Sequence, residues 1–286
     1  MTIFDHVHVF PRTDSRSSRL VHALKWGSTI RKHRYDVVID LQRNLVSRMI
    51  RRAAQPQAWG EFDRFSAKAA GDRVLETFHG TGFPQIEPLY QIKLQGALLA
   101  RARQLLEENG WDAKTALVVL NPAGLFASRN WPIQNYAYLG KLWREREEVK
   151  FVLLGTDRIR EKAELLQREF DGGMINLTGR TTLAEALGIL QFVKIIISED
   201  SGLMHMAWVS GVPTLALFGS TRHEWSQPVG AHTLLLHSGD LPCGGCMDSQ
   251  CRYGDVHCLT RYTPEFVLQK ARELSMPARH HETPFL

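Results

Sequence analysis

Four residues in the C-terminal half of the chain, three of them polar, could together bind an anionic ligand. Asp200, Ser201 and Gly202 directly follow a β-branched run, and His205 comes about one helical turn after Ser201. A helix predicted over 203–210 would begin at this turn, where free N–H groups and the positive end of the helix dipole favour a diphosphate. Asp200 would accept hydrogen bonds from hydroxyls such as those of a ribose, and His205 would face the same ligand. An ordinary capped helix start is the alternative interpretation.

A second turn of this kind surrounds Gly124 and Arg129. A buried strand predicted over 116–120 leads into Asn-Pro-Ala-Gly, and a Trp-Pro pair precedes the next helix. A guanidinium in this loop could hold a diphosphate through two parallel hydrogen bonds. Taken alone the pattern is weak, because Asn-Pro and Trp-Pro are common in loops.

All four cysteines of the chain lie close together in the sequence, as Cys243, Cys246, Cys251 and Cys258. Four thiolates in a compact loop could hold a structural zinc ion tetrahedrally. The spacing departs from paired C-x2-C motifs, so we expect a structural loop without metal and keep a zinc site as the alternative. A reducing cytoplasm argues against permanent disulfides.

Other catalytic patterns are missing from the sequence. The chain has no G-x-S-x-G nucleophile elbow, no D-x-D motif for a divalent metal, and no pair of carboxylates that stands out for glycoside hydrolysis. Binding and positioning of an anionic ligand is therefore the chemistry that the sequence favours.

The elements that must position these residues alternate between strands and helices. Strands are predicted over 7–10, 35–41, 116–120, 151–154, 174–177, 194–197, 214–218 and 233–237. Helices are predicted over 19–34, 46–54, 89–109, 134–148, 158–170, 183–193 and 203–210, with a last helix opened by Pro264. Thr182 and Glu185 have the spacing of a capping box. The alternation is typical of an α/β fold with a doubly wound parallel sheet.

The length of the chain suits two modest domains. It has 286 residues, of which 44% are hydrophobic, enough for two separate cores. We expect an N-terminal domain over 1–110, which includes a bridging helix over 89–109, and a C-terminal domain over 111–286.

Charge and hydropathy limit the partners and the location. The formal net charge is +5, and many basic residues lie before position 53. This face suits a phosphorylated acceptor or an anionic membrane surface, although plain solvation accounts for it equally well. Nucleic acid is disfavoured, because the basic residues are not interleaved with stacking aromatics. No apolar stretch reaches the roughly 18 residues that span a bilayer, and the N-terminus lacks a signal-peptide pattern, so we expect a cytoplasmic protein with at most peripheral membrane contact.

The segment 198–221 resembles the signature of glycosyltransferase family 9, the bacterial heptosyltransferases of lipopolysaccharide assembly. The family pattern runs close to S-x-D-S/T-G-x-x-H-x-A-A-x-x-G-x-P-T-x-x-L-F-G-x-T, and only Trp208 stands where it usually has a small residue. The stretch 121–132 resembles the family's N-P-G…K/R-x-W-P element. The similarity extends over about 36–268 and is strongest in 116–221.

The resemblance implies a donor site for a nucleoside-diphosphate sugar. Arg129 would face the donor phosphates, with Gly124 in the loop beside it. Glu161 and Thr181 belong to stretches that follow the next two strands and that lie near the nucleoside in the family. The candidate donor-binding residues are Gly124, Arg129, Glu161, Thr181, Asp200, Ser201, Gly202 and His205.

The resemblance also implies the fold and the reaction. It indicates a GT-B fold of two Rossmann-like, doubly wound parallel-sheet domains, with the acceptor bound mainly by 1–110 and the donor by 111–286. The expected activity is inverting, metal-independent transfer of a heptose or similar sugar from ADP-heptose, or another nucleoside-diphosphate sugar, to a lipopolysaccharide-type acceptor, without a cofactor.

The N-terminus departs from the family pattern. Family members normally begin with a strand, a Gly-Asp loop, a helix and a second strand, about 50–60 residues that have no counterpart here, so the N-terminal domain is expected to be incomplete. That loop carries the Asp thought to act as catalytic base, and we therefore assign no catalytic residue; Asp14 and Asp40 are only nearby carboxylates. The alternative is a catalytically inactive nucleotide-sugar-binding protein or fragment. A GT-B-like sugar-nucleotide epimerase shares the architecture but not the signature.

Overall fold

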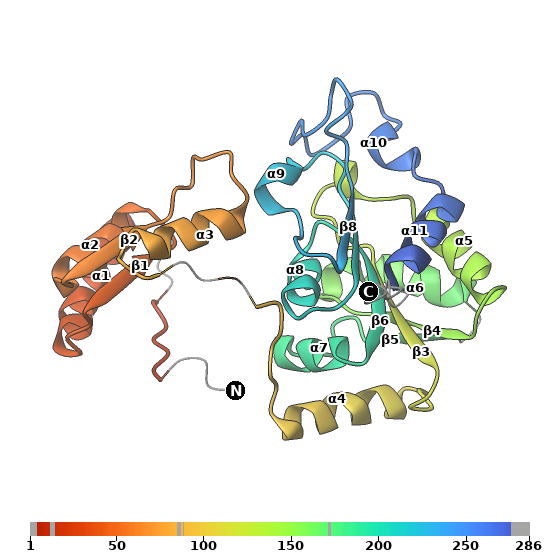
Figure 1. The fold of residues 1–286 in the computed structure, drawn as a ribbon, viewed down its shortest axis with the longest axis horizontal. Helices are drawn as coiled ribbons and strands as arrows, with labels where there is room; N and C mark the ends of the chain where they lie inside the picture. Colours follow the sequence, from red (N-terminus) through yellow and green to blue (C-terminus); the bar gives the residue numbers. More distant parts are fainter. Residues whose placement is uncertain (1–4, 12–14, 85–86, 88, 171–172, 276–286) are drawn as a thin grey trace, which may run out of the picture. The chain divides into compact units, whose positions relative to one another are not determined.

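The computed structural model describes all residues except 1–4, 12–14, 85–86, 88, 171–172 and 276–286. The chain divides into two compact units, one made of Met1–Pro88 with Glu224–Ser226 and the other of Leu89–His223 with Gln227–Leu286 (Figure 1). Each unit has its own parallel strand pairing. No described helix is both long and apolar enough to cross a membrane.

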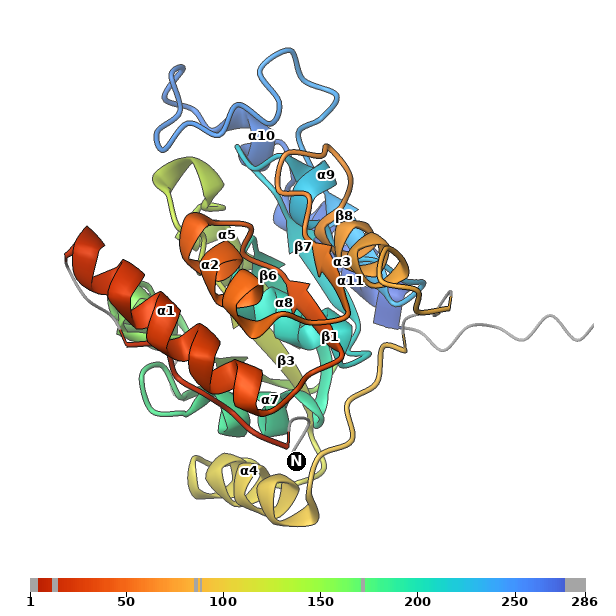
Figure 2. The ribbon, with the colours of Figure 1, turned by 90° about the vertical axis from the view of Figure 1, so that its left-hand side faces the viewer.

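The first unit combines helices with a short parallel sheet. Its elements are α1 (Arg16–Lys32), β1 (Val37–Asp40), α2 (Leu45–Ala54), β2 (Ala58–Glu61) and α3 (Ala70–His79). The two strands pair in parallel, from Val37 opposite Ala58 to Asp40 opposite Glu61. Helices α1 and α2 lie side by side (Figures 1 and 2). The absence of a side chain at Gly27 allows this approach, because a Cβ there would lie 2.3 Å from the Cβ of Ala53.

The second unit is built on a six-stranded parallel sheet in the order β5-β4-β3-β6-β7-β8. The strands are β3 (Ala116–Asn121), β4 (Val149–Leu153), β5 (Met174–Asn176), β6 (Val193–Glu199), β7 (Thr214–Leu217) and β8 (Thr233–Leu236). The main helices are α4 (Gly96–Glu108), α5 (Ile133–Arg144), α6 (Arg160–Glu169), α7 (Leu183–Leu190), α8 (Gly202–Val209) and α11 (Pro264–Ser275), and the shorter ones are η1 (Ala127–Arg129), η2 (Asp157–Ile159) and α10 (His257–Thr260). The short helix α9 (His223–Ser226) lies between β7 and β8 in the sequence, and its residues Glu224–Ser226 are grouped with the first unit. Numbered within the unit, the strand order is 3-2-1-4-5-6, the order of the dinucleotide-binding fold. This confirms the predicted doubly wound parallel sheet.

Alternate residues of the strands build a core on each face of this sheet. Val118 and Leu120 of β3 pack into the core that includes α5, α6 and α11, while Leu117 and Val119 pack into the core that includes α4, α7 and α8. All four of these side chains are at most 1% exposed. Strands with apolar residues on both faces are what a sheet covered by helices on both sides requires.

The first turn of α7 confirms the predicted capping box. The Thr182 hydroxyl accepts a hydrogen bond from the backbone N–H of Glu185 at 3.2 Å, and the Glu185 carboxylate accepts one from the backbone N–H of Thr182 at 2.9 Å. Helix α4 packs against α7, so its contacts place it with the second unit. The division of the chain therefore precedes α4, whereas the expected boundary at 110/111 follows it.

Three expectations about the elements were wrong. Residues 7–10 form no strand: Val7 and Val9 are 76% and 79% exposed, and none of the described strands pairs with the backbone of this stretch. The bridging helix begins only at Gly96 instead of 89. Conversely, β2 and α3 form in the stretch between α2 and Pro88, where no element was predicted.

Candidate functional site

The candidate residues gather where the strand order of the second sheet reverses. Strands β3 and β6 are neighbours there, and Asn121 at the end of β3 lies opposite Ser198 of β6. The Asn121 side-chain amide donates hydrogen bonds to the hydroxyls of Ser198 at 2.8 Å and Ser201 at 2.6 Å. Ligands of open α/β sheets bind in the crevice at this reversal, outside the carboxyl ends of the strands.

Helix α8 begins at this crevice, as the sequence predicted. Ser201 is its N-cap, and its hydroxyl accepts a hydrogen bond from the backbone N–H of Met204 at 3.2 Å. A Cβ added at Gly202 would meet no described atom within 4 Å. The first turn of α8 is therefore open on the side of Gly202, where its unpaired N–H groups can meet an anion.

Arg129 and Asp200, predicted as two separate ligand contacts, form an ion pair with each other. Arg129 Nη1 lies 3.1 Å from Asp200 Oδ2, and the side chains are only 11% and 13% exposed. The Thr221 hydroxyl donates a second hydrogen bond to the same oxygen at 2.8 Å. Arg129 Nε is buried and has no hydrogen-bond partner among the described residues. The guanidinium that could donate hydrogen bonds to a ligand diphosphate is therefore already held in place.

The loop that carries Arg129 is fixed at both ends by Glu199, which the sequence analysis did not single out. Glu199 is fully buried at the end of β6. Its Oε2 accepts a hydrogen bond from the backbone N–H of Gly124 at 2.6 Å, and its Oε1 accepts one from that of Trp131 at 2.7 Å. The only signal in the sequence was a carboxylate at the end of a strongly apolar strand.

Two cations hold the carbonyl groups of the same loop. Lys162 Nζ, on α6, donates hydrogen bonds to the carbonyl of Pro122 at 2.9 Å and to the side-chain oxygen of Asn130 at 2.7 Å. Arg158 donates to the carbonyl of Ala123 at 2.7 Å. Burial lowers the pKa of Lys162 from its usual value. The loop is thus held by three charged side chains.

His205 lies on α8 one turn after Ser201, with most of its ring buried. Its Nδ1 lies 3.1 Å from Nε1 of Trp208, whose indole N–H can only donate. Nδ1 is therefore the acceptor, and Nε2 carries the proton of the neutral ring. Burial lowers the pKa of His205, against a smaller opposing effect of Asp200. At neutral pH His205 can serve a ligand as a hydrogen-bond donor and not as a cation.

The remaining predicted residues lie at the ends of the next two strands. Glu161 is exposed in the first turn of α6, after β4, and Thr181 is half-buried in the loop after β5. In the described part of the chain, neither forms a hydrogen bond with Arg129 or Asp200. The structure therefore brings Arg129, Asp200, Ser201 and Gly124 together at one point.

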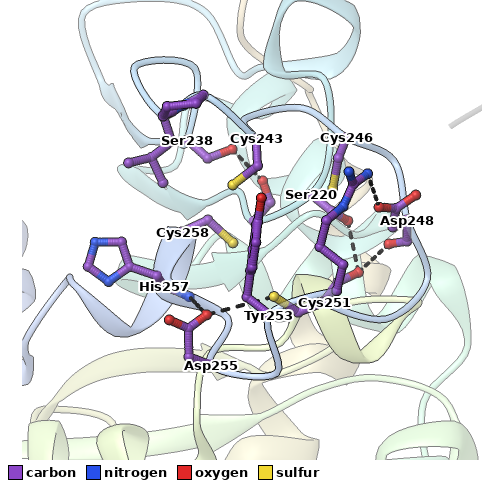
Figure 3. A pocket seen from close by; sticks show the side chains of 15 residues that line it. Ser220, Ser238, Cys243, Cys246, Asp248, Cys251, Tyr253, Asp255, His257 and Cys258 are labelled. Atoms are coloured by element: carbon purple, nitrogen blue, oxygen red, sulfur yellow. Dashed lines mark hydrogen bonds and ion pairs between the residues drawn. The ribbon is translucent and has the colours of Figure 1, made fainter.

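The four cysteines line a cavity of about 310 Å³ in the loop between β8 and α10 (Figure 3). Burial and the neighbouring cysteines raise the pKa of Cys258 to about 11. Within the described ranges, no three His, Cys, Asp or Glu side chains are arranged to hold a metal ion. The thiols border the cavity, and the alternative of a zinc site stays a prediction. The loop contacts the site, because the Ser128 hydroxyl donates to the carbonyl of Asp248.

We expect Gly124→Ala to destabilise the protein by about 1–3 kcal/mol, because the added methyl group overpacks the closed loop. The new Cβ would lie 2.5 Å from the carbonyl oxygen of Arg129 and 2.9 Å from Glu199 Oε2, and the first of these is backbone that must move. Urea denaturation measures the effect. Gly202→Ala is the matched control, since its Cβ enters open space. Equal, small changes in both variants would contradict the close contact at Gly124.

Three comparisons with known proteins agree on one family. The family model described as glycosyltransferase family 9 (heptosyltransferase) matches residues 71–257. Lipooligosaccharide heptosyltransferase 2 of Campylobacter jejuni is 25% identical over 200 residues, which are 68% of this chain and 59% of that protein. Lipopolysaccharide heptosyltransferase 1 of Pseudomonas aeruginosa is 25% identical over 260 residues, 82% of this chain and 72% of that protein. The chain thus spans about three fifths of the length of the Campylobacter relative.

Solved structures share the fold. The structure of Escherichia coli ADP-heptose lipopolysaccharide heptosyltransferase II matches with a TM-score of 0.72 and 20% identity, over 88% of this chain and 80% of that one. An E. coli heptosyltransferase solved with ADP matches with a TM-score of 0.64 and 19% identity, over 91% and 79%. These similarities confirm the expected α/β fold of the GT-B type.

Proposed function

Because the chain belongs to glycosyltransferase family 9, whose model matches more than half of its residues, we propose that it transfers a heptose from a nucleoside-diphosphate donor such as ADP-heptose to a lipopolysaccharide-core acceptor. The observation that carries the proposal is the meeting of Arg129, Asp200 and the start of α8 at the reversal of the sheet. The ADP bound in the E. coli relative supports an adenine nucleotide as the donor's carrier.

The donor diphosphate would lie between the first turn of α8 and Arg129. Two buried polar atoms without hydrogen-bond partners among the described residues, Asn121 Oδ1 and Arg129 Nε, belong to residues at this point. Buried polar groups usually find partners, so their lack of one supports a site that a ligand completes. Asp200 and the Nε2–H of His205 would contact donor hydroxyls, and Glu161 and Thr181 would lie toward the nucleoside.

In the proposed reaction, an acceptor hydroxyl attacks the anomeric carbon of the heptose and forms the new glycosidic bond. The bond from that carbon to the diphosphate breaks, and ADP leaves with the electron pair. Arg129 and the α8 N–H groups would stabilise the negative charge that grows on the leaving diphosphate. We assign this donor role to the second unit and acceptor binding to the first, at the cytoplasmic face of the inner membrane.

The group that takes the acceptor proton is not assigned. Asp40 is a poor candidate because its carboxylate already accepts hydrogen bonds from the backbone N–H groups of Gln42 and Arg43, at 3.0 Å each, and from the Ser47 hydroxyl at 2.8 Å. Asp14 lies outside the described residues. The second candidate function, a nucleotide-sugar-binding protein without transferase activity, follows from the absence of an assigned base.

Donor binding and turnover measured on one preparation test the proposal. We expect calorimetry to show binding of ADP, and incubation with ADP-heptose and a heptose-free core acceptor to release ADP and yield a heptosylated product. Binding without transfer to any core acceptor would favour the inactive binder. Absence of ADP binding would contradict both functions.

A further inference from the structure

A buried carboxylate joins the two ends of the loop that carries Arg129. Glu199 accepts backbone hydrogen bonds at 2.6 Å and 2.7 Å from Gly124 and Trp131, which stand on either side of the segment 125–130. Each of its two oxygens serves one end of the loop. A single ionised side chain therefore closes the loop on the end of β6, next to Asp200.

The loop has little freedom while this carboxylate is ionised. Gly124 packs so closely on Arg129 that a Cβ would lie 2.5 Å from the Arg129 carbonyl oxygen. At the other end, the indole N–H of Trp131 donates to the carbonyl of Tyr262 at 2.9 Å, and its side chain is only 1% exposed. The position of the Arg129 backbone is thus set by anchors at Gly124 and Trp131, and Glu199 holds both.

The surroundings of Glu199 make its ionisation costly. Burial raises the pKa of Glu199 to about 7, although Lys162 on α6, the two backbone N–H groups and Tyr136 on α5 all oppose the rise. The Tyr136 hydroxyl is fully buried beside Glu199, where it can donate a hydrogen bond to the ionised carboxylate or accept one from the neutral acid. Both protonation states are therefore accessible near neutral pH, and they differ in what they can hold.

We propose that Glu199 is a positioning residue of the donor site, whose ionised carboxylate holds Gly124 and Trp131 and thereby keeps Arg129 in place for the donor diphosphate. The proposal rests on the proposed function in assigning the diphosphate to Arg129. Protonation makes one carboxyl oxygen a weaker acceptor, so the hydrogen bond from one of the two backbone N–H groups weakens and that end of the loop is held less firmly. Arg129 then samples other positions, and Asp200 loses its fixed partner.

The sign of the pH effect follows from this exchange. Above the pKa of Glu199 the loop is closed, and below it the loop is open. If only the closed form binds ADP well, the apparent affinity scales with the ionised fraction, which falls about tenfold from pH 8 to pH 6. The ADP phosphate also titrates in this range. The pH dependence of ADP affinity must therefore be compared with that of a variant in which residue 199 cannot ionise.

Calorimetry with ADP at pH 6 and pH 8 tests the proposal on the full chain. We expect the dissociation constant of the wild type to rise about tenfold more between pH 8 and pH 6 than that of Glu199→Gln. Glu147→Gln is the control, because Glu147 is a half-buried glutamate that is also hydrogen-bonded through both oxygens, to Lys194 at 2.7 Å and to Trp143 at 2.6 Å. It should keep the pH dependence of the wild type. Equal pH dependence in the wild type and Glu199→Gln would overturn the proposal.

Amide hydrogen exchange of the ligand-free protein separates this inference from the proposed function. After correction for intrinsic rates, the amides of Gly124 and Trp131 should be better protected at pH 8 than at pH 6 in the wild type and equally protected at both in Glu199→Gln. If this exchange pattern is found but ADP does not bind, the donor role is refuted, while the role of Glu199 in holding Gly124 and Trp131 is retained. Equal protection of these amides at pH 8 and pH 6 in the wild type would overturn the proposed role of Glu199. This readout stands even if Glu199→Gln does not fold.

Discussion

Replacing Arg129 by alanine should weaken ADP binding about a hundredfold, roughly 3 kcal/mol, and leave adenosine binding almost unchanged. Charge-assisted hydrogen bonds from a guanidinium to a diphosphate are among the strongest single contacts available to a protein. Arg129 is held by Asp200 at 3.1 Å and is only 11% exposed, so little side-chain freedom remains to be lost on binding. Adenosine lacks the diphosphate and should not detect the change. Calorimetry with both ligands measures the difference.

Arg129→Ala also removes the ion-pair partner of Asp200, so part of the loss of ADP affinity comes from Asp200. Without Arg129 the Asp200 carboxylate keeps only the hydroxyl of Thr221 at 2.8 Å, and its charge would repel the diphosphate. Arg129→Ala combined with Asp200→Asn should therefore recover part of the lost affinity. Arg144→Ala is the control, because that exposed arginine lies at the end of α5, just before the amino end of β4 and away from the crevice. Equal losses for ADP and adenosine would mean that Arg129 acts through packing.

The local signals in the sequence predicted where the crevice lies but not which of its side chains contact each other. The turn before α8 could be predicted because its signals are close together in the sequence. These signals are the apolar strand before the turn, the N-cap Ser201 and Gly211 after the helix. The capping box of α7 was predictable for the same reason. The Arg129–Asp200 pair could not be predicted, because its partners are 71 positions apart and only the pairing of β3 with β6 brings them together.

The role of Glu199 was hidden for a related reason. It occupies a position that the family pattern leaves open, and a carboxylate at the end of a strand is expected to face solvent. Only the arrangement of α5, α6 and the loop 125–130 over the end of β6 shows that it is fully buried. The strand expected over 7–10 was wrong for the opposite reason: its alternating pattern is present, but no strand in the described part of the chain pairs with it. Local pattern predicts an element only when its tertiary partner exists.

Glu199 should also make the stability of the protein depend on pH in an uncommon direction. Its pKa in the folded protein is raised to about 7 from an ordinary value of 4.5, so the folded state holds this proton more tightly than the unfolded state. The stabilising contribution is fully present below pH 4.5 and is lost as pH rises through 7. Between pH 4.5 and 8.5 the free energy of unfolding of the wild type should fall by about 3 kcal/mol relative to Glu199→Gln.

Urea denaturation of both proteins across this range measures the difference. The hydrogen bond from Lys194 is among the causes that lower the pKa of Glu147, so the wild type should show no such fall relative to Glu147→Gln, which retains Glu199. A constant difference between the wild type and Glu199→Gln would mean that the pKa of Glu199 is the same in the folded and unfolded protein and is not raised by burial. The expected fall would instead show that the protein holds a costly charge at neutral pH. That cost is consistent with a residue whose ionised form holds the loop that carries Arg129. A neutral glutamine would stabilise the fold, but its single side-chain oxygen would hold only one end of that loop.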